Sequence, residues 1–119
     1  MTFGHYQQRA RETAQYPDIG GIGLVYLVIG LAGEAGEVSE KFKKILRDHK
    51  GIITQESRMA IIKETGDCLW YLANIAWELG VDLKTVAEIN IAKLEHRKQT
   101  GNIQGEGDNR GEVGHEISI

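Results

Sequence analysis

The segment ETGDCLWYLANIAWEL, residues 64–79, determines which fold this chain can adopt. From Cys68 to Leu79 it is apolar on nearly every side of a helix. A helix that is hydrophobic all round must be covered all round. A chain of 119 residues has too few other helices to cover it alone. The segment therefore predicts an all-α bundle of about four helices per chain, completed by homodimerisation into a dimer or a dimer of dimers.

The other helices are predicted from caps, stops and apolar periodicity. Thr2, Thr54 and Asp82 are capping residues, and Gly80 is a helix stop. We expect helices over residues 3–16, 22–48, 55–79 and 83–98, with Pro17 ending the first segment. No β-type alternation of useful length and no internal repeat occurs.

The C-terminal part has a different composition. Residues 101–119 carry five glycines among polar residues and cannot bury much surface on their own. We predict a helical domain over residues 1–100 and a glycine-rich polar tail over 101–119. The tail either becomes ordered when it meets substrate or is a disordered terminus.

Two acidic pairs carry the chemistry. Glu34 and Glu37 are three residues apart on one predicted helix, and Glu64 and Asp67 have the same spacing on the next. Residues at i and i+3 share a helix face, so each pair directs two carboxylates the same way. Carboxylates crowded near apolar surface need a neutralising charge. Four oxygen ligands suit a hard divalent cation, Mg²⁺ or alternatively Mn²⁺. The competing interpretation is two ordinary solvated acidic faces.

Other metal chemistries fit the sequence less well. A redox di-iron bundle uses Glu-x-x-His twice, whereas the one such pair here is Glu112 and His115 in the tail. The four histidines form no zinc pattern. Cys68 is expected to be a small buried apolar residue.

Cationic residues on two predicted helices could bind phosphate. Lys44 follows Glu37 by seven residues, and Asn90, Lys93 and Arg97 form one polar stripe near the C-terminus. Lysine and arginine neutralise phosphate oxygens, and asparagine can bind a sugar or base edge. Each set also has a simpler interpretation, an i,i+4 ion-pair ladder for the first and a solvated helix face for the second.

Net charge, hydrophobic patterning and cysteine content argue against several classes of protein. The net charge of −3 indicates no basic footprint for nucleic acid. The longest uncharged run, residues 19–33, is too short to span a bilayer and is interrupted by glycines. A single cysteine and the lack of a signal-peptide pattern favour a cytoplasmic protein with no membrane partner.

The chain resembles the MazG family of all-α nucleoside triphosphate pyrophosphohydrolases. The resemblance covers nearly the whole chain, and a six-residue tail stretch is similar to one in single-domain bacterial and phage members. It rests on Gly33-Glu34-Ala35-Gly36-Glu37-Val38, Glu64-Thr65-Gly66-Asp67, Asn90-Ile91-Ala92-Lys93-Leu94 and Gly105-Glu106-Gly107-Asp108-Asn109-Arg110.

The resemblance implies a Mg²⁺-dependent enzyme that cleaves a nucleoside triphosphate between the α and β phosphates, in nucleotide-pool housekeeping. The nucleotide is released as a monophosphate, together with pyrophosphate. The alternative is a non-enzymatic helical dimer that acts as an interaction module. The resemblance implies metal ligation by Glu34, Glu37, Glu64 and Asp67, and substrate binding by Asn90, Lys93, Arg97, Lys44 and Arg110.

Overall fold

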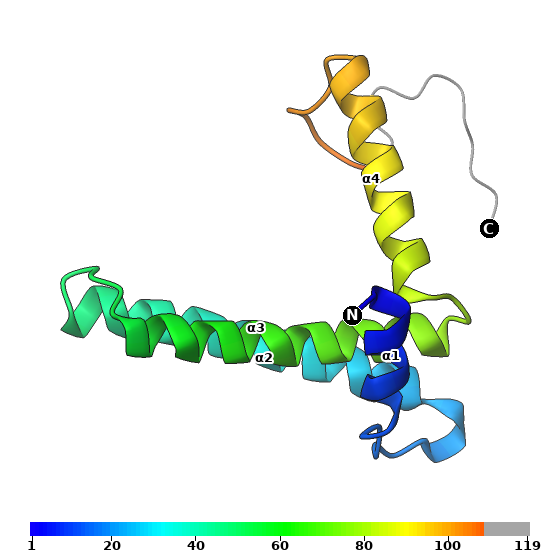
Figure 1. The fold of residues 1–119 in the computed structure, drawn as a ribbon, viewed down its shortest axis with the longest axis horizontal. Coiled ribbons are helices and arrows are strands. Elements are labelled where there is room, and N and C mark those ends of the chain that lie inside the picture. Colours follow the sequence, from blue (N-terminus) through cyan, green and yellow to red (C-terminus); the bar gives the residue numbers. More distant parts are fainter. Residues whose placement is uncertain (109–119) are drawn as a thin grey trace. The chain divides into compact units, whose positions relative to one another are not determined.

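The structure is a computed structural model that describes residues 1–108. These residues form four α-helices and one short 3-10 helix, without any strand (Figure 1). The prediction of an all-α chain with four α-helices is confirmed. Contacts divide the chain into two compact units, Met1–Leu83 and Lys84–Ile119, which are described separately.

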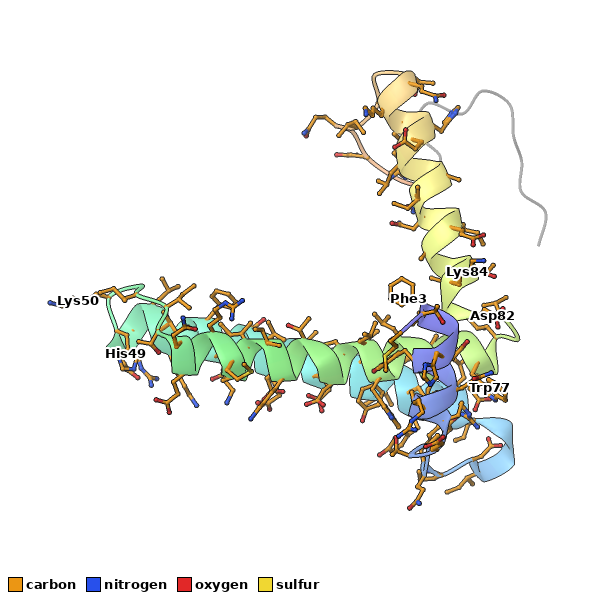
Figure 2. The ribbon with its side chains drawn as sticks, in the orientation of Figure 1. Phe3, His49, Lys50, Trp77, Asp82 and Lys84 are labelled. Atoms are coloured by element: carbon orange, nitrogen blue, oxygen red, sulfur yellow. The ribbon has the colours of Figure 1, made fainter. Side chains whose placement is uncertain are left out.

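The first unit is built on a long antiparallel hairpin. Helix α2 spans Gly23–Asp48 and α3 spans Gln55–Glu78, and the two lie side by side along most of their length (Figure 1). Lys50 and Gly51 form the turn with φ angles of 53° and 77°. The hydroxyl of Thr54 accepts a hydrogen bond from Ser57 N, which completes a capping box at the start of α3. His49 and Lys50 therefore lie at the opposite end of the hairpin from Trp77 (Figure 2).

Helix α1, Phe3–Arg11, begins at the predicted cap, because the Thr2 hydroxyl accepts a hydrogen bond from His5 N. It ends earlier than the predicted residue 16. The Thr13 hydroxyl donates to the carbonyl oxygen of Ala10 and accepts a hydrogen bond from Trp70 Nε1 at 2.8 Å. These side-chain hydrogen bonds replace a further helical turn and hold the chain against α3.

A small core joins α1 to the end of α3. Ala10, Ala73 and Leu83 are buried together, with Tyr6, Leu69 and Trp70 packed against them. Gln7 is also buried, and its amide is fully used: Nε2 donates to the carbonyl oxygens of Ala73 and Val81, and Oε1 accepts from Leu83 N, each at 3.2 Å. This polar bridge fixes the chain where it leaves α3.

The hairpin leaves much apolar side chain uncovered. Leu27 and Ile45 are the buried large apolar residues of α2, whereas Ile29 is 68% exposed and Leu46 is 71% exposed. Single exposed apolar residues are ordinary, but a series of them along two paired helices is typical of a surface that another chain covers. Further members of this series are Val25, Val28, Phe42, Met59, Ile62 and Leu72.

Helix α4 spans Leu83–Gln99, and from Lys84 onward it belongs to the second unit together with the segment that follows it. Gly101 has a φ of 73°, and Asn102 N donates to the carbonyl oxygen of Arg97 at 2.7 Å, which reverses the chain at the end of the helix. The chain then runs back along α4 as far as Asp108. None of the helices within residues 1–108 is both long enough and apolar enough to cross a membrane.

Candidate functional site: an acidic cluster between two helices

Three carboxylates meet where α2 lies beside α3. Glu34 comes from α2, and Glu64 and Asp67 come from α3. One oxygen of each carboxylate lies within 4.8 Å of the others. Within residues 1–108, no lysine or arginine forms an ion pair with any of the three. The described part of the chain therefore brings three carboxylates together without a lysine or arginine to balance them.

The electrostatics of Glu34 reflect this crowding. Desolvation raises the pKa of the Glu34 carboxyl above its ordinary value, and the charges of Asp67 and Glu64 raise it further. A hydrogen bond to Glu64 and the charge of Glu37 act in the same direction. A shared proton is one way to relieve such repulsion, and a bound cation is the other. The donor set is all oxygen, which fits a hard divalent ion.

The other two predicted residues on α2 are positioned differently. Glu37 is one turn beyond Glu34, is exposed, and is close enough to raise the pKa of Glu34. Lys44 is ten residues beyond Glu34, about 15 Å further along a helix axis. Lys44 instead lines a cavity of about 320 Å³ near the hairpin turn, together with Lys41, His49 and Ser57. The group of carboxylates within 4.8 Å of one another therefore includes neither Glu37 nor Lys44, although the charge of Glu37 still acts on Glu34.

Three helical glycines that neighbour the carboxylates in the sequence face open space. A Cβ atom added to Gly33, Gly36 or Gly66 would meet no atom within 4 Å in the described part of the chain. Glycine inside a helix costs about 1 kcal/mol relative to alanine. No contact within residues 1–108 accounts for these glycines.

Two uncharged groups border the cluster. Burial raises the pKa of the Cys68 thiol, and the charges of Glu34, Asp67 and Glu64 add to this effect. Burial also raises the pKa of the Tyr71 phenol, with contributions from Tyr26, Glu34 and Asp67. Sequence reasoning identified Cys68 as an inert apolar residue and missed Tyr71. Its spacing could have identified it, because Tyr71 is four residues after Asp67 and lies on the same helix face.

The predicted substrate-binding residues of α4 form a separate group within the second unit. Lys93 Nζ contacts the Asp108 carboxylate at 3.0 Å, and Arg97 Nη2 contacts it at 3.3 Å. Arg97 is only 5% exposed and also donates to the carbonyl oxygen of Asp108 at 2.7 Å. Asn90 is exposed on the same helix. Arg110, the remaining predicted residue, lies outside the described residues.

The guanidinium of Arg97 is buried beneath the segment that follows α4. Among the described residues its buried Nε has no hydrogen-bond partner, while Nη2 donates to the backbone of Gly107 and Asp108. The pKa of the Asp108 carboxyl is held below its usual value by its hydrogen bond and charge interaction with Lys93, and Arg97 adds to this effect. Sequence reasoning did not identify Asp108 as the acceptor for these two cations.

Comparison with known proteins assigns this arrangement to a family. The model of the MazG nucleotide pyrophosphohydrolase domain matches residues 25–101, which include the acidic cluster and the cations of α4. The chain belongs to the MazG family. The gene 37 protein of Mycobacterium phage L5 is 51% identical over 109 residues, which cover 88% of this chain and 96% of that protein. No solved structure matches the chain. The resemblance drawn from the acidic motifs is confirmed, and MazG membership implies pyrophosphohydrolase activity in general.

Proposed function

We propose that this MazG protein is a Mg²⁺-dependent nucleoside triphosphate pyrophosphohydrolase that releases a nucleoside monophosphate and pyrophosphate. The observation that carries the proposal is the convergence of Glu34, Glu64 and Asp67 within 4.8 Å, with no lysine or arginine of residues 1–108 paired to them. These three would hold the ion, with Glu37 as the fourth carboxylate of the group. Mn²⁺ has similar oxygen preferences and should substitute for Mg²⁺.

The chemistry needs little from the protein beyond charge and position. A bound divalent ion polarises the α-phosphoryl group and lowers the pKa of a coordinated water. Phosphoryl transfer depends on charge neutralisation and alignment more than on a covalent intermediate. The carboxylates that hold the ion would also orient the attacking water, and a carboxylate of the group that does not hold the ion would accept its proton. Lys93 and Asn90 supply contacts to the phosphates and the sugar of the substrate.

The reaction products test this proposal directly. With Mg²⁺, a nucleoside triphosphate should yield monophosphate and pyrophosphate in equal amounts, resolved by ion-exchange chromatography. Excess EDTA should abolish the reaction, and added Mn²⁺ should restore it. Diphosphate and orthophosphate as first products would contradict cleavage between the α and β phosphates. Activity that resists EDTA would contradict the metal requirement, and a protein inactive on all NTPs and dNTPs would support the interaction-module alternative.

The segment after α4 should contribute to substrate binding. We expect truncation after Ile103 to preserve α4, because the hydrogen bond from Asn102 N to the Arg97 carbonyl oxygen is retained. The truncation removes Asp108, which orders Lys93 and Arg97, and also Arg110. KM should rise about tenfold, the effect of losing one hydrogen bond to a charged group. Steady-state kinetics beside a thermal melt will check this, and unchanged kinetics would mean that the tail is only a terminus.

We propose in addition that two copies associate through the hairpin. The exposed apolar residues of α2 and α3 support this, because a monomer would leave them in water. An obligate helical dimer buries such residues as a domain core does. Association into a dimer or a dimer of dimers would also explain why α3 is apolar on faces that neither α1 nor α2 covers.

A further inference from the structure

The ring of Tyr71 lies directly against the backbone of α2 at Gly30. A Cβ atom added to Gly30 would overlap the ring and come within 2.8 Å of its hydroxyl oxygen. Gly30 does not have a positive φ, so its backbone conformation does not call for glycine. Glycine is also unfavourable inside a helix. Clearance for the Tyr71 ring is therefore the feature that explains a glycine at this position.

This contact lies one helical turn from the acidic cluster on both helices. Gly30 precedes Glu34 by four residues, and Tyr71 follows Asp67 by four, so each shares a face with a carboxylate. The phenol interacts electrostatically with Glu34 and Asp67. The ring of Trp70 meets the Tyr71 ring edge-on, with centroids 5.0 Å apart and planes at 83°. The Tyr71 hydroxyl is thus held at the edge of the cluster.

We propose that Tyr71 is a substrate-positioning residue, whose hydroxyl donates a hydrogen bond to an oxygen of the nucleotide held beside the carboxylates, and that Gly30 provides the space for it. This inference rests on the proposed function. A phenol suits the position because it is a neutral donor. A lysine there would pair with the carboxylates and compete with the metal ion. The oxygen belongs to a phosphate or to the sugar, and the two sources are separable by experiment.

The decisive variant is Tyr71→Phe, which keeps the ring over Gly30 and removes only the hydroxyl. We expect kcat/KM to fall about tenfold, as for loss of one substrate hydrogen bond. The melting temperature and its increase on adding Mg²⁺ should stay unchanged. Tyr16→Phe is the matched control, because the Tyr16 hydroxyl bonds to Arg11 and Glu78 and not to the cluster. It should keep the kcat/KM of wild type.

The Gly30 part of the inference has its own test. Gly30→Ala should displace the ring and lower kcat/KM at least as far as Tyr71→Phe does. In a Tyr71→Ala background the same alanine meets no ring, so it should raise the melting temperature through its better helix propensity. This double-mutant cycle measures coupling between the two positions. Additive effects in both activity and melting would overturn the assigned role of Gly30.

A binding measurement separates this inference from the proposed function. The probe is a nucleoside triphosphate whose α–β bridging oxygen is replaced by methylene, titrated calorimetrically with Mg²⁺. Tyr71→Phe should bind it about tenfold more weakly than wild type. If binding of inorganic triphosphate weakens equally, the bonded oxygen is on a phosphate; if it does not, the oxygen is on the sugar. Wild-type activity and affinity in Tyr71→Phe would overturn the positioning role alone. If the wild-type protein binds the analogue but hydrolyses no nucleotide, only the proposed function is overturned. If the wild-type protein does not bind the analogue, both the proposed function and the role of Tyr71 are overturned.

Discussion

Replacing Glu34, Glu64 or Asp67 by the corresponding amide should lower turnover by roughly 100- to 10,000-fold. A bound metal ion contributes several kcal/mol of transition-state stabilisation, and each amide removes a negative ligand from it. We expect a similar decrease in turnover for Glu37→Gln. This variant tests whether the fourth carboxylate acts with the other three. Initial rates at saturating Mg²⁺ will measure the effect.

The thermal stability of the Glu34→Gln variant should change in the opposite direction from its turnover. The pKa of Glu34 is raised in the folded protein. A carboxyl with a raised folded-state pKa contributes stability below its unfolded pKa, and this contribution is lost as pH rises through the folded value. At neutral pH without metal, Glu34 therefore opposes folding. Glu34→Gln should hold or raise the melting temperature in EDTA, and it should reduce the increase on adding Mg²⁺.

A surface carboxylate on the same helix provides the control. Glu40 lies on α2 and contacts Lys43 at 3.4 Å in an exposed ion pair. Such pairs contribute little to stability. Glu40→Gln should leave turnover, melting in EDTA and the Mg²⁺ response as in wild type. Near-normal rates in all the cluster variants would instead mean that the acidic pairs are ordinary solvated side chains.

The chain's helices were predictable because their ends carry local signals. Thr2 and Thr54 cap as expected, and Gly80, with a φ of 75°, ends α3. The early end of α1 was not predictable, because it depends on the hydrogen bond from Trp70 Nε1 to the Thr13 hydroxyl, a partner 57 residues away. Local propensity contains no information about such a distant partner.

The candidate site was predictable to a similar degree. Spacing placed Glu64 and Asp67 on one face, and the pairing of α2 with α3 brings Glu34 to them. Three features required coordinates. Lys44 lies too far along α2 to join the cluster, Arg97 is buried under the returning chain, and the Tyr71 ring fills the space above Gly30. Each depends on side-chain direction, which periodicity alone does not determine.

Leu72→Glu should disrupt the proposed homodimer. Leu72 lies in the apolar part of α3 and is 43% exposed in the single chain. If the partner copy covers this face, the variant buries an unpaired carboxylate, which costs several kcal/mol. The dissociation constant should rise roughly 100-fold or more. Light scattering at micromolar concentration should find no substantial monomer in wild type and mostly monomer, or unfolded chain, in the variant.

A charge on a different face of the same helix separates dissociation from general destabilisation. Lys63→Glu introduces the same side chain at an exposed position of α3, and it should remain dimeric with a melting temperature close to wild type. Leu72→Ala keeps the surface apolar and should weaken the dimer less than Leu72→Glu does, without unfolding the hairpin. A folded, monomeric wild type would contradict the homodimer. It would mean that the exposed residues of α2 and α3 serve another partner, because water alone leaves this apolar surface unfavourably solvated.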